Sequence, residues 1–76
     1  MILVLRSDAE GEVLIGVIEK IEDMDVRVCL DIEDRILSKA TREELHAYQR
    51  DHDALHRAVF KKYRDDITEY KAVVVY

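Results

Sequence analysis

A single long segment without proline, residues 41–64, constrains the fold of this chain more than any other feature. Its apolar side chains recur at spacings of three and four, which places them in one stripe along a helix. The stripe consists of Leu45, Tyr48, His52, Leu55, Val59 and Tyr63. The chain on both sides has the composition of β-strands. The segment therefore predicts an α+β protein with one helix of about 36 Å.

Sequence signals mark both the start and the end of this predicted helix. Thr41 and Glu44 have the spacing of a capping box, in which each side chain satisfies a backbone amide of the other residue. Basic residues fill the last turn, where they suit the negative end of the helix dipole, and Asp65 follows them. The stripe keeps its phase through residues 49–53, so the pattern favours one continuous helix over two.

Two apolar runs precede the helix and predict a β-hairpin. The run Ile2 to Leu5 is too short for a helix and is typical of a strand buried on both faces. Turn-forming residues then end in Gly11, and Val13 to Ile18 forms the second run. Gly16 inside that run indicates a β-bulge or a close approach of another part of the chain.

The following residues predict a third strand. After an acidic turn, Val26, Val28 and Leu30 alternate with polar residues, which is the period of a half-buried strand. Residues 32–39 are expected to form a loop or a single helical turn, and Tyr70 to Tyr76 a fourth strand. We therefore predict one domain, residues 1–76, with an antiparallel sheet of about four strands in the order β-β-β-α-β and the long helix on one face.

Composition places the chain among ordinary globular proteins. Hydrophobic residues make up 49% and charged residues 38% of the 76 residues, and the net charge is −5. Cys29 is alone, so no internal disulfide forms, and a reducing cytoplasm is the expected location. The five apolar residues at the start are too few for a signal peptide or a membrane span.

Few residues suggest catalytic or metal chemistry. His52 and His56 are four apart on the helix and could share a metal, but zinc normally takes three or four protein ligands. We expect them to be partly buried and hydrogen-bonded. The expected third strand holds Cys29 between Arg27 and Asp31, which favours a structural thiol over a reactive one. We therefore predict no enzyme and no bound cofactor or metal.

Basic residues gather on the outer side of the predicted helix. Those that we predict to contact a partner are Arg50, Arg57, Lys61 and Arg64. Such a stripe could bind an acidic protein surface or nucleic acid phosphates. The helix is also longer than strands of about 20–23 Å, so its excess length could pack on a second copy and form a homodimer.

Several hydrophobic spacings resemble those of a known bacterial family. They are Val28-Cys29-Leu30-Asp31-Ile32, then Ile36-Leu37, then Leu45, Tyr48, His52, Leu55 and Ala58, and finally Val73-Val74-Val75. Over about residues 13–76 the chain resembles the domain-of-unknown-function family fourteen eighty-eight. It lacks the Trp near the start and the Phe-Gly pair often found in that family. The resemblance implies the same β-β-β-α-β order and brings no established activity or functional residue.

These observations lead to one expected function and two alternatives. We expect a small cytoplasmic accessory or regulatory protein that acts through protein–protein contacts. The first alternative is a weak nucleic-acid-binding module that uses the basic stripe. The second is a metal- or thiol-dependent enzyme, which the sequence favours least.

Overall fold

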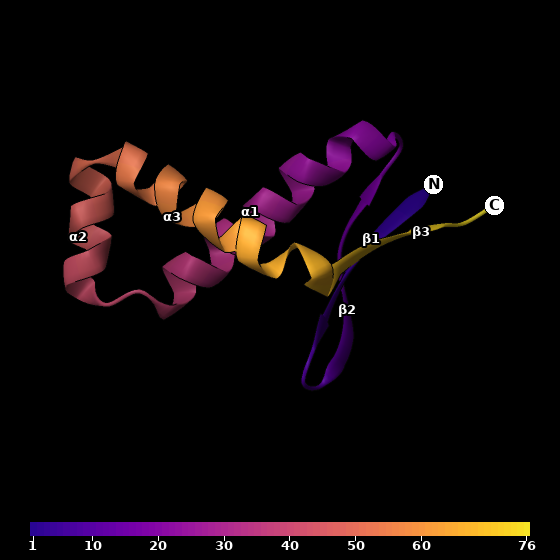
Figure 1. Cartoon of the computed structure of the whole chain (residues 1–76), viewed down its shortest axis with the longest axis horizontal. Coiled ribbons are helices and arrows are strands. Elements are labelled where there is room, and N and C mark those ends of the chain that lie inside the picture. The colour runs from indigo at the N-terminus through magenta and orange to yellow at the C-terminus, as the bar shows by residue number, and fades with distance from the viewer.

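The computed structural model describes all residues, 1–76, and has an α+β fold (Figure 1). The molecule measures 45 × 27 × 17 Å. The two short 3₁₀ turns are called η1 and η2. In chain order the elements are β1 (Ile2–Asp8), β2 (Gly11–Ile18), η1 (Ile21–Asp23), α1 (Met24–Lys39), α2 (Arg42–Arg50), α3 (His52–Asp66), η2 (Ile67–Glu69) and β3 (Tyr70–Val74).

The sheet has three antiparallel strands in the order β2-β1-β3. The predicted hairpin is confirmed as β1 and β2, and the predicted C-terminal strand as β3. Gly11 closes the hairpin turn with a φ of 123°, a conformation that glycine adopts without strain. β1 is thus the central strand, and its two neighbours come from opposite ends of the chain.

The predicted third strand is wrong, because residues 26–30 belong to helix α1. A second pattern in the same residues decides the structure. Val28 and Ile32, four apart, are 1% and 0% exposed against the sheet, whereas Val26 and Leu30 lie on the outer side. Residues 32–39, predicted as a loop or a single helical turn, are helical and belong to α1, which continues as one helix to Lys39.

The predicted single long helix is wrong as well, because the helix is interrupted at Asp51, between α2 and α3. This residue has extended backbone angles, φ −138° and ψ 91°, and its carboxylate accepts hydrogen bonds from the amides of Asp53 and Ala54. An aspartate that caps a new helix competes with continuation of the old one. The predicted capping box of Thr41 and Glu44 is confirmed at the start of α2. Figure 1 shows α2 turned away from the direction of α3.

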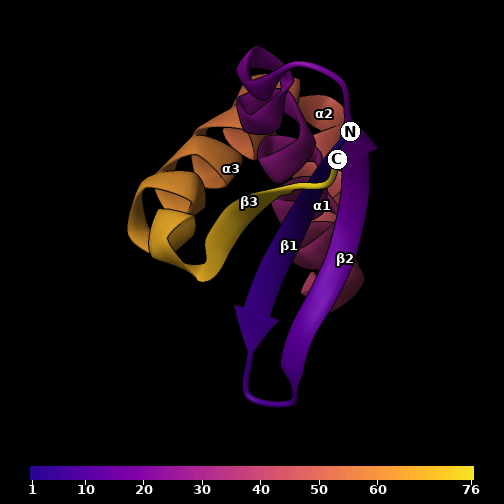
Figure 2. The ribbon, with the colours of Figure 1, turned by 90° about the vertical axis from the view of Figure 1, so that its right-hand side faces the viewer.

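Helices cover one face of the sheet only. In Figure 2, β1 and β2 lie in front of α1 and α2, and no helix crosses their near side. The core forms where α1 and α3 meet the covered face. Its seven buried residues are Val4, Ile18, Val28, Ile32, Leu55, Val59 and Tyr70.

A polar network links β1, α1 and β3 beside this core. The Nη1 group of Arg6 donates to both carboxylate oxygens of Asp31, at 2.8 and 2.7 Å, and the Tyr70 hydroxyl donates to the same carboxylate at 2.7 Å. Burial and the hydrogen bond to Asp31 raise the pKa of Tyr70. The network therefore satisfies the polar groups that the packing of three elements removes from water.

Both predicted features of Gly16 are confirmed. The register shifts between Val4, which pairs with Gly16, and Leu5, which pairs with Leu14, so β2 contains a bulge. A Cβ atom at position 16 would overlap Cδ of Arg27 on α1. The Arg27 side chain thus packs against Gly16, and a larger residue at position 16 would displace it.

We predict that Gly16→Ala lowers the free energy of unfolding by about 1–3 kcal/mol, because the added methyl group overlaps the Arg27 side chain. Urea unfolding followed by circular dichroism measures the change. In an Arg27→Ala background the same substitution should be neutral, since the overlapping atoms are gone. An equal loss in both backgrounds would show that the contact with Arg27 is not the cause.

Candidate protein-binding site

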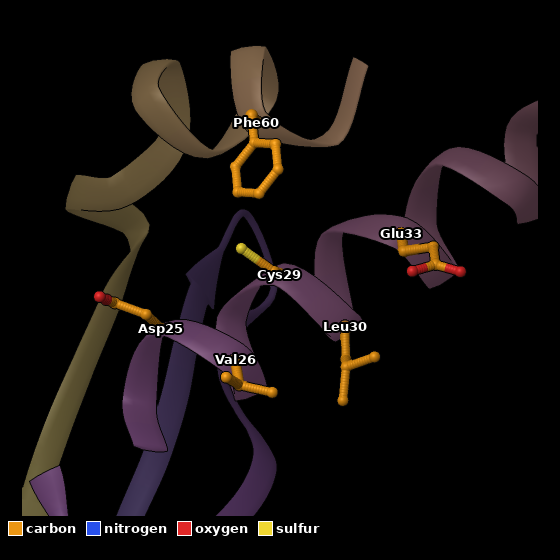
Figure 3. A pocket seen from close by; sticks show the side chains of 6 residues that line it. All are labelled: Asp25, Val26, Cys29, Leu30, Glu33 and Phe60. Atoms are coloured by element: carbon orange, nitrogen blue, oxygen red, sulfur yellow. The ribbon is translucent and has the colours of Figure 1, made fainter. Parts of the chain in front are cut away.

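An apolar groove of about 270 Å³ lies between α1 and α3. Figure 3 shows the Phe60 ring pointing from α3 towards Cys29 on α1. Three of the apolar side chains that line the groove are well exposed: Val26 at 64%, Phe60 at 58% and Leu30 at 45%. Its full lining is Asp25, Val26, Cys29, Leu30, Glu33 and Phe60. Apolar side chains that gather in one exposed place are typical of an interaction site.

The packing of the two helices positions these side chains. On α1, Val28 and Ile32 face the core, which leaves Val26 and Leu30 on the outer side one turn apart. On α3, Val59 is buried, and Phe60 is the next residue along the helix. The outer faces of both helices therefore carry apolar side chains that no other part of the chain covers.

A hydrogen bond fixes one end of the groove. The Tyr63 hydroxyl on α3 donates to the Asp25 carboxylate on α1 at 2.7 Å. This bond, together with burial and the charge of Asp25, raises the pKa of Tyr63 to about 12. This hydrogen bond joins the two helices one turn along α3 from Phe60.

The Tyr63–Asp25 bond predicts a loss of stability at alkaline pH. The phenol ionises near pH 10 in the unfolded chain and near 12 in the folded protein. Between these values only the unfolded state loses this proton, so the free energy of unfolding should fall as pH rises from 10 towards 12. Unfolding in urea across this range measures the slope.

Two variants test this assignment. Tyr63→Phe should reduce the alkaline slope, and Asp25→Asn should move the Tyr63 titration back towards its ordinary pKa, which phenolate absorbance follows directly. An unchanged slope in Tyr63→Phe would contradict the assignment.

Cys29 lies on helix α1 and not on the expected strand. Burial and then the charge of Asp25 raise the pKa of this thiol. Because the thiolate is the reactive form, this environment opposes use of Cys29 as a nucleophile at neutral pH. The half-buried sulfur contributes apolar surface to the floor of the groove.

Carboxylates surround the two exposed apolar residues of α1. Glu22 and Asp23 precede Val26 by four and three residues, and Glu33 and Asp34 follow Leu30 by three and four. None of these four carboxylates forms an ion pair within the chain. Of these four only Glu33 lines the groove, beside Asp25, so the acidic rim on the α1 side of the groove consists of Asp25 and Glu33, neither of which forms an ion pair.

The α3 side of the groove carries the opposite charge. Arg57 precedes Phe60 by three residues and Arg64 follows it by four, so both lie one helical turn from the ring. Arg57 contacts Asp51 at 3.5 Å, and both side chains are largely exposed. An exposed pair of this kind contributes little to stability and leaves Arg57 free to exchange partners.

The break at Asp51 separates the four residues predicted to bind a partner. Arg57 and Arg64 flank Phe60 on α3, whereas Lys61 lines a hollow with Ile36 and Tyr48. Arg50 is on α2, in a hollow formed with other polar residues of that helix: Arg42, Glu43 and His46. They do not form one continuous stripe along a single helix.

The environment of the two histidines differs from the prediction. His52 and His56 are exposed, and neither imidazole makes a hydrogen bond to the chain, so the predicted partial burial and hydrogen bonding are wrong. No group of three or more His, Cys, Asp or Glu side chains is arranged to hold a metal ion. None of the helices combines the length and the apolar character needed to cross a membrane.

The surface formed by Val26, Leu30 and Phe60 was not predicted from the sequence. Two signals point to it. Phe60 is the only phenylalanine and lies outside the apolar stripe of its helix. If residues 24–39 are taken as a helix, Val26 and Leu30 fall opposite the residues that the core requires.

Comparison with protein-family models, curated proteins and solved structures finds no match to this chain. The resemblance to family fourteen eighty-eight therefore stays a prediction.

Proposed function

We propose that this chain is a small accessory or regulatory protein of the cytoplasm that acts by binding another protein in the groove between α1 and α3. The observation that carries the proposal is the exposure of Val26, Leu30 and Phe60 around one apolar groove. Burial of such side chains provides the main favourable free energy of protein association.

The occupant that suits this groove is an amphipathic helix of the partner. A helix presents apolar side chains at spacings of three and four, which matches the one-turn spacing of Val26 and Leu30. Lysine or arginine on one flank of that helix would meet the unpaired carboxylates of the α1 rim. Acidic residues on its other flank would meet Arg57 and Arg64. Opposite charges on the two sides would set the orientation of the bound helix.

Affinity capture from a lysate of the source cells tests this function. The bait proteins are the wild type and a Leu30→Ser/Phe60→Ser double variant, each used with and without nuclease. We expect a protein that the wild type recovers after nuclease treatment and that the double variant loses. Chemical cross-linking followed by mass spectrometry should connect a basic amphipathic segment of that protein to α1.

The matched control is Arg50→Glu, which changes the charge on α2 and leaves the groove intact. It should retain the partner. Recovery that disappears with nuclease would favour the nucleic-acid alternative. A partner held equally by the wild type and the groove variant would refute the assignment of the groove.

A further inference from the structure

The face of the sheet that the helices leave uncovered carries apolar side chains on all three strands. Since Val4 points into the core, its neighbours Leu3 and Leu5 lie on the opposite face. The register pairs Leu3 with Val17 and Val73, and Leu5 with Leu14. The residues of this open sheet face are Met1, Leu3, Leu5, Leu14, Val17, Val73 and Val75. We propose that this face binds the same face of a second copy of the chain.

The strand sequences support burial of both faces. An antiparallel sheet with one face in water normally alternates apolar and polar residues. Here Ile2 to Leu5 is apolar at every position, and so is Ala72 to Val75. Such continuous runs are typical of strands buried on both sides. The chain supplies a cover for only one side, which leaves the second side for a partner.

The accessible area is large for a chain of this mass. The surface measures 5649 Å², whereas a compact protein of 8.9 kDa exposes about 4,800 Å². The radius of gyration is 13.6 Å, compared with about 11 Å for a compact domain of this length. The excess area is roughly 800 Å², which is the share that one partner buries in an interface of standard size.

The exposed apolar side chains indicate that much of this excess surface area lies on the sheet. Helix α2 also adds surface, but most of its exposed side chains are polar. On the open sheet face Leu14 is 54% and Val17 50% exposed. These are branched side chains on β2, where contact with a second sheet would cover them.

The partner that this face fits is a second copy. The charged groups at one end of the face, Lys71 and Glu12, already form an ion pair with each other. A partner therefore needs to supply apolar surface without a compensating charge. The same face of another copy supplies it, because an interface around a two-fold axis brings identical patches together. Two sheets packed in this way form a sandwich with a separation of about 10 Å.

The resulting dimer would have its helices on the outside. Because α1 and α3 lie on the covered side of each sheet, the groove between them stays accessible in both copies. The inference about the open sheet face does not depend on the groove, and separate residues test the two surfaces.

Sedimentation equilibrium of the wild-type protein tests the dimer. We expect a mass twice that of the 8.9 kDa chain at concentrations of about 10 µM and above. The dimer should persist in high salt, since its contacts are apolar. The midpoint of thermal unfolding should rise with protein concentration, because association stabilises the folded state. This measurement needs no variant.

A Leu14→Lys/Val73→Lys double variant should raise the dissociation constant at least about 100-fold, because both charges would be buried at the interface. The matched control is Leu30→Ser/Phe60→Ser, which alters exposed apolar residues on the helical side and should leave the dimer intact. Circular dichroism checks that each variant folds.

Three results would overturn the inference. One is a wild-type monomer whose unfolding midpoint is independent of concentration. Another is a dimer that resists the sheet variant and dissociates in the control. The last is a different protein that occupies the open sheet face of a wild-type monomer.

Discussion

Replacing Ile32 by alanine is expected to lower the free energy of unfolding by about 2–5 kcal/mol. Ile32 is 0% exposed and joins α1 to the sheet within the core cluster. The substitution removes buried methyl groups and leaves a cavity that neighbouring side chains fill only in part. A domain of this length has a total stability of roughly 4–11 kcal/mol. Because only seven residues are buried, the loss removes a large share of it. Urea unfolding followed by far-UV circular dichroism measures the change.

The matched control for Ile32 is Val26→Ala on the same helix. Val26 is 64% exposed, so its replacement should change stability by less than about 0.5 kcal/mol. The two variants then differ in burial while the helix is the same. Similar losses in both would contradict the packing of α1 against the sheet. A larger loss in Val26→Ala would place the core on the opposite side of the helix.

The strands were predictable because local signals agreed with the final structure. Ile2 to Leu5 and Val13 to Ile18 are separated by turn residues that end in Gly11, and a hairpin satisfies all of these features together. Gly16 also predicted the local structure correctly, since the bulge lies directly beside it and the absence of a side chain lets Arg27 pack against it.

Helix α1 was not predictable from the alternation of Val26, Val28 and Leu30. Only Val28 of these three is part of the core. The other two are exposed apolar residues at positions where an amphipathic helix normally has polar ones. Together with Val28 they give the sequence an apolar–polar alternation that is typical of a strand. Residues of a binding surface are expected to break the local pattern in this way. The error in the fold and the missed groove thus have one cause.

The break between α2 and α3 depends on one side chain. The apolar stripe continues in phase from Tyr48 to Leu55, so periodicity alone predicts a continuous helix. Asp51 instead caps the amides of a new helix, an outcome that depends on tertiary packing of α2 as well as on residue type. The break also moves Arg50 away from Arg57 and Arg64, which changes the candidate binding surface.

Asp31→Ala is the second substitution with a large expected effect, a loss of about 2–3 kcal/mol in the free energy of unfolding. The Asp31 carboxylate accepts two hydrogen bonds from Arg6 and one from Tyr70. Its side chain is 13% exposed and that of Arg6 17%, so water replaces these bonds poorly. The substitution leaves the Arg6 guanidinium with only the carboxylate of Asp8, 3.9 Å away, and leaves the buried Tyr70 hydroxyl without an acceptor. Chemical unfolding near neutral pH measures the loss.

A double-mutant cycle separates this network from a general effect on α1. Arg6→Met alone should be destabilising, whereas in the Asp31→Ala background it should cost much less or restore stability, because no unpaired charge remains. Glu33→Ala is the matched control, since Glu33 is on the same helix and forms no ion pair. It should change stability by less than about 0.5 kcal/mol. Additive losses for Arg6 and Asp31 would show that their contact does not connect β1 to α1 energetically.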